Sequence, residues 1–251
     1  MTLPATETHP GFDGAPLAVH RMGEGRPVLL LHGLFSDAAT NWIKYGHARR
    51  LAHAGFEAIM PDFRAHGQSA KPHDPVAYPP DVLVRDTFAL VEEMGLTDYD
   101  LVGFSLGSRT AARAVIAGLE PRRLVLAGMG LEGLAGWNRR SAFFLDAIAR
   151  FDAVKHGDPA FMAVAFMKTQ KVDRVAARLL LESVGDTDPA ELEKIAMPTL
   201  VLCGAKDRDN GDPVKLAEAL PDARHLEVPG THMSSVTEAA LGDGIVDFLA
   251  A

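Results

Sequence analysis

Short, mainly apolar runs alternate along the chain with longer stretches whose apolar positions recur at helical spacing. The apolar runs cover 28–31, 56–60, 101–104, 123–127 and 199–203, and they are typical of strands that are buried on both faces. The stretches 38–54, 81–94, 106–117 and 213–220 are compatible with helices. Further strands are predicted at 12–21 and 225–228, and a final helix ends near Leu249. We therefore expect an α/β fold: a doubly wound, mostly parallel sheet of about eight strands.

The alternation stops between residues 131 and 189, where the sequence favours several helices. Five of the chain's twelve phenylalanines lie in this segment. These are Phe143, Phe144, Phe151, Phe161 and Phe166. The segment is interpreted as a helical cap (lid) inserted over the site, or its phenylalanines only pack against the rest of the domain. The first interpretation divides the chain into a core of residues 1–130 and 190–251 and a cap of residues 131–189.

Composition limits the classes of partner. The chain has 251 residues, of which 47% are hydrophobic, and this suits one α/β domain with an insertion. Its net charge is −8 and its basic residues are scattered, which argues against nucleic acid and against an anionic membrane surface. No secretory signal or bilayer-spanning run is visible. We expect a cytoplasmic monomer or homodimer that acts on a small molecule.

The stretch from Tyr99 to Ile116 carries the first candidate chemistry. A short buried strand is followed by Gly103-Phe104-Ser105-Leu106-Gly107 and then by a helix-favouring run. A serine on so sharp a turn needs glycine two residues to either side, because larger side chains would collide there. The turn would raise the Ser105 hydroxyl above the sheet and would place the backbone N–H of Leu106 beside it.

An acid and a histidine follow later strands, in the chain order serine, aspartate, histidine. Catalytic groups of open parallel sheets gather beyond the carboxyl ends of the strands, and Ser105, Asp207 and His232 each lie a few residues past such an end. Serine needs a base to remove its proton, and the imidazole of His232 titrates close to neutral pH. Asp207 would orient that imidazole, although Asp209 and Asp212 share its loop.

Taken together, the motifs resemble those of the α/β-hydrolase family. They comprise His32-Gly33 after a buried strand, Asp62-x-Arg64-x-x-Gly67-x-Ser69, Gly103 to Gly107, Gly204-x-x-Asp207, and Pro229-Gly230-Thr231-His232. The resemblance spans almost the whole chain from about residue 10. It departs from the family at Ala65 and Ser108, where glycine is frequent.

The resemblance implies roles for several residues. Ser105 would be the nucleophile, His232 the base and Asp207 the acid, because Gly-x-x-Asp after this strand is the family's usual position. The oxyanion hole would use the backbone N–H groups of Leu106 and Leu34, with Phe35 as the alternative second donor. His32, Asp62, Arg64 and His66 would brace loops. Candidate pocket residues are Phe35, Phe104, Met129, Trp137, Phe143 and Phe144.

These features predict a serine hydrolase that cleaves a small to medium, largely apolar carboxylic ester through an acyl-enzyme. The resemblance leaves open carbon–carbon bond hydrolysis, lactone or thioester hydrolysis, cofactor-free perhydrolysis, and a non-enzymatic small-molecule receptor. A serine at the elbow disfavours dehalogenase and most epoxide hydrolase chemistry, which uses aspartate there. Gly128 to Gly133 also fits a dinucleotide-binding pattern, with Asp152 some twenty residues later, but Gly136 interrupts its helix. No metal or cofactor is predicted.

Overall fold

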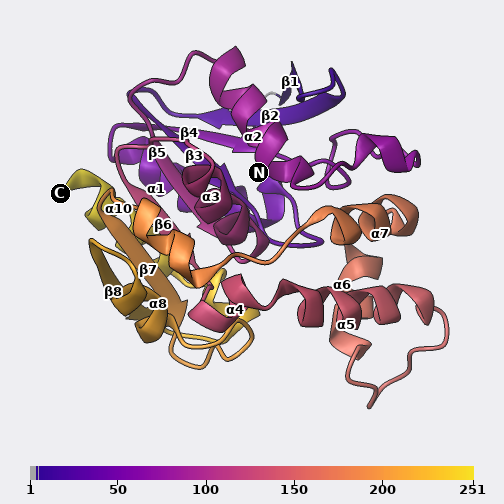
Figure 1. Cartoon of the computed structure of the whole chain (residues 1–251). Coiled ribbons are helices and arrows are strands. Elements are labelled where there is room, and N and C mark those ends of the chain that lie inside the picture. Colours follow the sequence, from indigo (N-terminus) through magenta and orange to yellow (C-terminus); the bar gives the residue numbers. More distant parts are fainter. Residues whose placement is uncertain (1–3, 5) are drawn as a thin grey trace.

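The protein is built on one eight-stranded sheet. The computed structural model describes residue 4 and residues 6–251 (Figure 1), so part of the predicted tail lies outside the described residues. The sheet order is β1-β2-β4-β3-β5-β6-β7-β8. The strands are β1 (Thr6–Pro10), β2 (Pro16–Met22), β3 (Arg26–Leu31), β4 (Phe56–Pro61), β5 (Asp100–Phe104), β6 (Leu124–Ala127), β7 (Thr199–Gly204) and β8 (Ala223–Val228). Strands β3 to β8 run parallel, whereas β2 is antiparallel to both of its neighbours. The predicted mostly parallel sheet is confirmed.

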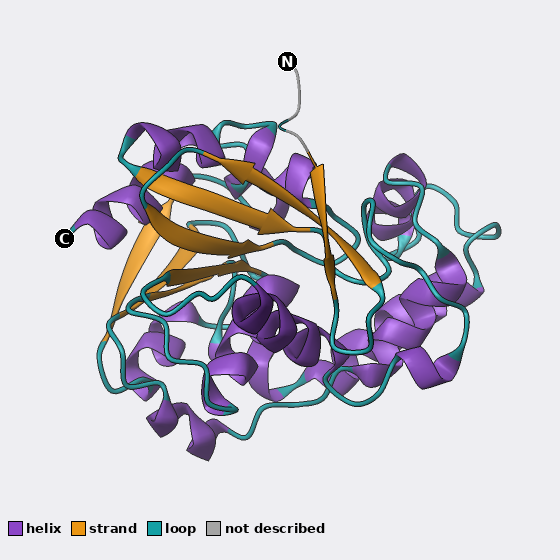
Figure 2. Ribbon diagram, turned by 90° about the horizontal axis from the view of Figure 1, so that it is seen from above, coloured by secondary structure: helices purple, strands orange, loops and turns teal. Residues whose placement is uncertain are grey.

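Helices cover both faces of the sheet (Figure 2). The helices that pack on one face are α2 (Val82–Glu93), α3 (Leu106–Ile116), α8 (Pro213–Ala219) and the 3₁₀-helix η3 (Pro189–Lys194). On the other face lie α1 (His47–His53), α10 (Ala239–Ala250) and the short π-helix η1 (Ala39–Ile43). A second 3₁₀-helix, η2 (Pro75–Ala77), precedes α2, and α9 (His232–Ser235) precedes α10.

Strand β3 shows why the apolar runs form this arrangement. Its side chains alternate between the two cores: Leu29 and Leu31 pack in one, Val28 and Leu30 in the other. All four are fully buried. Since both faces of the strand are covered, every position has to be apolar, which gives a continuous run and not an alternating one.

Two predicted elements differ in the structure. The helix expected over 38–54 is divided into η1 and α1, because Gly46 between them takes a left-handed conformation with φ of 82°. His232, expected in a loop, is the first residue of α9. Thr231 caps that helix: its hydroxyl accepts from the Ser234 amide and the Ser234 hydroxyl accepts from the Thr231 amide.

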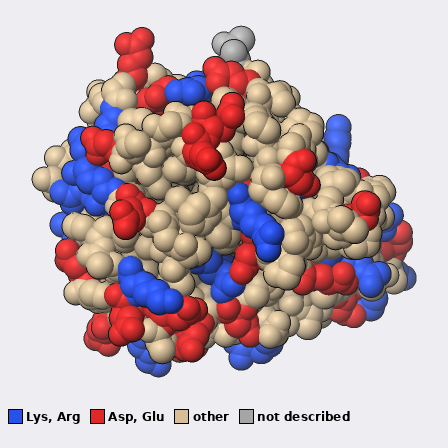
Figure 3. All heavy atoms as spheres, turned by 45° about the horizontal axis from the view of Figure 1, so that its top comes forward, with Lys and Arg blue, Asp and Glu red and all other residues tan. Residues whose placement is uncertain are grey.

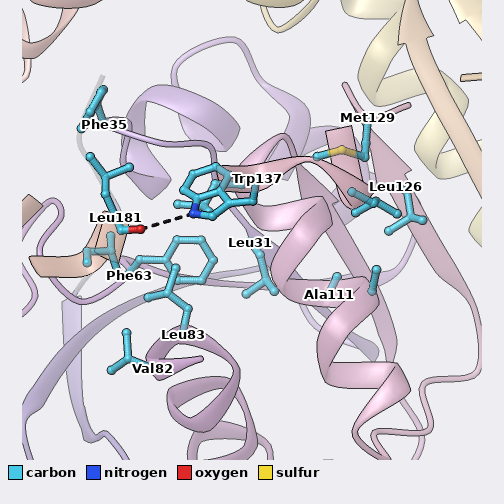
Figure 4. Close-up of a cluster of buried hydrophobic side chains, with 14 of the residues drawn as sticks. Leu31, Phe35, Phe63, Val82, Leu83, Ala111, Leu126, Met129, Trp137 and Leu181 are labelled. Atoms are coloured by element: carbon cyan, nitrogen blue, oxygen red, sulfur yellow. Dashed lines mark hydrogen bonds between the residues drawn. The ribbon is translucent and has the colours of Figure 1, made fainter. Parts of the chain in front are cut away.

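The segment between β6 and β7 is helical. It holds α4 (Leu131–Ala135), α5 (Trp137–Ala149), α6 (Phe161–Thr169) and α7 (Arg174–Ser183), followed by η3. Figure 1 shows α5, α6 and α7 grouped at one side of the sheet. Trp137 joins the segment to the main core, where it lies near Leu31 and Phe63 and donates through Nε1 to the carbonyl of Leu181 at 3.3 Å (Figure 4). None of the described helices is long and apolar enough to cross a membrane.

Candidate active site

Ser105 lies on a strained turn between β5 and α3. Its φ is 54° and its ψ is −110°, a conformation that is costly for a residue with a side chain. A Cβ on Gly103 would collide with the backbone of Gly107 and Ser108, and one on Gly107 would collide with the carbonyl of Leu31. The two glycines therefore allow the turn to pack against the strands beneath it.

A continuous chain of hydrogen bonds joins the serine, the histidine and the aspartate. His232 Nε2 lies 3.0 Å from Ser105 Oγ, and His232 Nδ1 lies 2.8 Å from Asp207 Oδ2. The three residues are 5–8% exposed. The Phe104 ring packs against the imidazole, with 5.2 Å between the ring centroids. Water therefore has little access to these hydrogen bonds, while the hydroxyl remains at the surface of a pocket.

The loops that carry Asp207 and His232 are held together by backbone hydrogen bonds. The amide of Ala205 donates to the carbonyl of Val228 at 2.7 Å, and the amide of Lys206 donates to that of Gly230 at 2.8 Å. The backbone amide of Asp207 donates to the carbonyl of Gly204 at 2.8 Å. These contacts extend the parallel pairing of β7 and β8 past the ends of the strands, and they bring the carboxylate beside the imidazole.

The other two acids of this loop lie elsewhere. Asp209 is exposed, and its amide donates to Asp207 Oδ1 at 3.0 Å, whereas Asp212 accepts from the first amides of α8 as its N-cap. Burial by itself would raise the pKa of Asp207. The hydrogen bond and charge of His232, the Asp209 amide and the charge of Arg140 outweigh burial, so the pKa lies below its usual value. Asp207 is therefore ionised at neutral pH.

The loop after β3 approaches Ser105 with one of its two candidate amides already used. The Phe35 N–H donates to His66 Nε2 at 3.0 Å, and His66 Nδ1 lies 3.0 Å from the carbonyl of Arg64. Burial, together with the nearby His32, lowers the pKa of His66 to about 3, so this ring is neutral and can accept. The Phe35 amide is thus engaged, and Leu34 is the one of the two residues that lines the pocket beside Ser105.

A pocket of about 20 Å³ adjoins Ser105, room for about one water molecule. Its lining comprises Leu34, Ser105, Leu106, Arg109, Met129, Gly133, Trp137, Arg140, Phe144 and Asn210. Three of the six predicted pocket residues, Met129, Trp137 and Phe144, are among them. Phe35 and Phe143 contact the ring of Phe144 edge to face, with 5.4 and 5.2 Å between the centroids, and Phe104 packs against His232.

Apart from Ser105, the polar residues of the lining were not anticipated from the sequence. Arg109 follows Ser105 by four residues in the helix that begins at the elbow, so both can face the pocket. Arg140 lies between Trp137 and Phe144 at spacings of three and four, which places the three residues on one face of α5. This spacing is the sequence feature that could have predicted Arg140 as a pocket residue. Asn210, which donates to the carbonyl of Gly128 at 2.7 Å, had no comparable signal.

The glycines of the dinucleotide-like pattern serve a packing role. The amides of Gly130 and Gly133 donate to the carbonyl of Asn210 at 3.1 and 2.8 Å. Side chains at either glycine would collide with the loop that follows Asp207. Asp152 is 82% exposed and pairs with Arg174. Within the described part of the chain, no group of three or more His, Cys, Asp or Glu residues is placed to hold a metal ion.

Sequence comparison identifies relatives of several activities. Residues 26–169 match the family model described as the alpha/beta hydrolase fold. An epoxide hydrolase from Caballeronia sordidicola is 34% identical over 104 residues, which are 41% of this chain but only 31% of that protein. Longer matches at 27% identity are the AB hydrolase superfamily protein YisY from Bacillus subtilis (strain 168), covering 76% of this chain and 78% of the relative, and the non-heme chloroperoxidase CPO-A1 from Kitasatospora aureofaciens, covering 84% and 86%.

Solved structures resemble the fold over nearly the whole chain. An esterase from Exiguobacterium antarcticum superposes with a TM-score of 0.80 at 20% identity, covering 98% of this chain and 100% of the esterase. The enol-lactonase from Burkholderia xenovorans LB400 gives a TM-score of 0.77 at 22% identity, with the same coverage. At this identity the likeness concerns the fold alone. The family model, which matches more than half of the chain, agrees with it: the protein belongs to the alpha/beta hydrolase fold family.

Proposed function

We propose that the protein is a serine hydrolase that cleaves a small carboxylic ester through an acyl-enzyme. The observation that carries this proposal is the chain of hydrogen bonds from Ser105 through His232 to Asp207. A serine hydroxyl is a weak nucleophile at neutral pH, and it needs a base within hydrogen-bond distance and a third group to orient that base. The three side chains meet this requirement, and the strained elbow exposes the hydroxyl to the pocket.

The first half of the reaction forms the acyl-enzyme. Ser105 Oγ attacks the ester carbonyl carbon while His232 Nε2 takes its proton, and the ionised Asp207 stabilises the resulting imidazolium. The negative oxygen of the tetrahedral intermediate accepts hydrogen bonds from the N–H groups of Leu34 and Leu106. His232 then gives its proton to the alcohol oxygen as the carbon–oxygen bond breaks, which leaves the acyl group on Ser105.

Water completes the reaction by the same route. His232 takes a proton from a water molecule, which attacks the acyl carbon, and the proton then returns to Ser105 Oγ as the acid leaves. This second half argues against the activity of the epoxide hydrolase relatives. Attack of Ser105 on an epoxide would form an ether, which has no carbonyl for water to attack.

A fluorophosphonate probe tests the proposal. Phosphonylation should add one adduct, on Ser105, detected by intact mass and peptide mapping. Ser105→Ala should abolish the adduct and lower kcat for a small ester by about 10⁴-fold or more, and His232→Ala should slow both reactions strongly. Ser183→Ala is the matched control: Ser183 is also buried, but its hydroxyl donates to the carbonyl of Leu180 inside α7. A folded wild-type protein that takes up no label would refute the proposal.

A further inference from the structure

Two guanidinium groups line the pocket beside Ser105. Arg109 extends from α3, one turn after the serine, and Arg140 extends from α5. Arg109 is 1% exposed and Arg140 is partly buried. An ester without a charged group would gain nothing from positive charge in its pocket. The two arginines therefore indicate a different kind of substrate.

Neither arginine pairs with a carboxylate anywhere in the described part of the chain. Arg109 donates to two backbone carbonyls, those of Gly185 at 3.0 Å and Gly133, and lies 4.9 Å from the centre of the Trp137 ring. Arg140 donates to the carbonyl of Asp209 at 2.5 Å and lies 5.5 Å from the centre of the Phe144 ring. A guanidinium has five N–H donors, so each of the two arginines keeps N–H groups that these contacts do not use.

Arg64 provides the comparison inside the same molecule. Its guanidinium is also fully buried, but it lies between the carboxylates of Asp13 and Asp86, at 2.7 and 2.8 Å. A buried cation without a counter-ion is costly, and structural arginines are normally compensated in the way that Arg64 is. Among the described residues, the pocket arginines therefore differ from Arg64 in having no carboxylate partner.

The electrostatics of the pocket favour a negative ligand. Burial lowers the pKa of Arg109 to about 9, with the like charges of Arg113 and Arg140 acting in the same direction and the charge of Asp186 opposing them. Burial also lowers the pKa of Arg140, against the charges of Asp209 and Asp207. Both groups are still protonated at neutral pH, so an anion that entered the pocket would offset the desolvation penalty of the two buried cations.

We propose that the pocket binds an ester whose acid part ends in a second, ionised carboxylate, held by Arg140 and Arg109. This inference rests on the proposed function and adds the substrate class to it. The apolar lining from Leu34, Met129 and Phe144 suits a short hydrocarbon link between the ester and the charge. A planar carboxylate matches the fork of a guanidinium, which can donate to both of its oxygens.

The test compares substrates that differ only in charge. The monoethyl esters of succinate, glutarate and adipate are each measured against the ethyl ester in which an amide replaces the free carboxylate. For at least one length, kcat/KM of the charged ester should exceed that of the amide by about tenfold or more. Arg140→Met should lower this ratio about tenfold, mainly through KM. Arg139→Met is the matched control, because this neighbour is exposed, lies outside the pocket lining and should leave the ratio unchanged.

Arg140 is the residue chosen for substitution because Arg109 also donates to two backbone carbonyls, so that a variant without Arg109 could fail to fold. Arg109→Lys, which keeps the charge but loses the fork, should give an intermediate ratio. A ratio near one in the wild type, or a high ratio that survives Arg140→Met, would overturn the anion proposal. Phosphonate labelling of Ser105 tests the hydrolase proposal independently of the anion proposal.

Binding to the Ser105→Ala protein tests the anion site without turnover. In calorimetric titration, glutarate should bind at least tenfold more tightly than its uncharged diamide, and Arg140→Met should remove the difference. Equal affinities for the two ligands would overturn the proposal, whatever the labelling experiment finds.

Discussion

The carboxylate of Asp62 lies beneath the loop that carries Leu34. It is 2% exposed, accepts from the amides of Ala38 at 2.8 Å and Gln68 at 2.7 Å, and lies 3.7 Å from His20 Nε2. Burial by itself would raise its pKa. The contact with His20, the nearby His32 and the two amides outweigh burial and lower the pKa to about 2. One carboxylate thus ties the loop after β3 to the loop after β4.

The lowered pKa of Asp62 predicts a dependence of stability on pH. Its folded value of about 2 lies below the ordinary 3.8, so the stabilisation is fully present above pH 4 and is lost as the pH falls towards 2. At pH 7 it amounts to about 2 kcal/mol. Asp62→Asn should lower the free energy of unfolding by about that amount at pH 7 and by much less at pH 2.5, measured by urea denaturation.

The exposed carboxylate of Asp243 gives the control for this experiment. It is 60% exposed and pairs only with Arg50 at the surface, so Asp243→Asn should change the stability by less than about 0.5 kcal/mol at either pH. A difference between wild type and Asp62→Asn that stays constant from pH 7 to pH 2.5 would contradict the role of ionised Asp62.

Helix α3 holds both connections of the helical segment that follows β6. Arg109 donates to the carbonyls of Gly133, where the segment begins, and of Gly185, where it returns. One turn later, Arg113 donates to the carbonyl of Asp186 and forms a two-pronged ion pair with Asp81. The helix that positions Ser105 therefore also positions the wall of the pocket that α5 contributes.

Loss of Arg113 should loosen the returning connection while leaving the sheet intact. Arg113→Met removes the contact with the Asp186 carbonyl and the partly buried pair with Asp81, so amides of residues 184–188 should exchange with deuterium about tenfold faster. Amides of β5 and β7 should keep their protection. Arg178→Met, which removes an exposed pair with Glu182 in α7, should leave residues 184–188 unchanged. If amides of residues 184–188 exchanged at the same rate in the Arg113→Met and Arg178→Met variants, the proposed role of Arg113 in holding the returning connection would be wrong.

The elements predicted well are those whose signal is local. Two-sided burial makes β3 and β5 continuous apolar runs, and the collision that excludes a side chain at Gly103 involves Gly107 and Ser108 of the same turn. The division of the 38–54 helix depends on the left-handed conformation of Gly46, which a hydrophobic pattern does not reveal. The polar half of the pocket depends on how α5 docks against α3. The placement of Arg140 is therefore a tertiary property.

At the scale of the whole molecule, one buried cluster of charges is centred on Arg64. Its guanidinium joins the turn between β1 and β2 through Asp13, the loop after β4 through its own backbone, and α2 through Asp86. Elsewhere charges of both signs are interspersed over the face shown in Figure 3. Such surface pairs contribute little each, whereas the Arg64 cluster connects three segments that are far apart in the sequence.

Replacing Arg64 alone should lower the free energy of unfolding much more than replacing Arg64 and Asp86 together. Arg64→Met leaves the carboxylate of Asp86, which is 2% exposed, without its cation and should cost about 3–5 kcal/mol. The double variant Arg64→Met with Asp86→Leu should recover most of this loss, measured by chemical denaturation in a double-mutant cycle. Arg21→Met, which breaks a partly exposed pair with Glu57, should cost about 1 kcal/mol or less. Additive losses in the double variant would contradict this account.

The pocket beside Ser105 has walls of two different origins. Leu34, Leu106 and Arg109 belong to the loops and helix of the sheet, whereas Trp137, Arg140 and Phe144 belong to α5. The second wall arrives on one uninterrupted stretch of chain that leaves the sheet after β6 and returns before β7. Grafting that stretch from a relative would exchange half of the recognition surface in a single step. Selectivity could then diverge between lineages while the bond-breaking machinery was inherited unchanged.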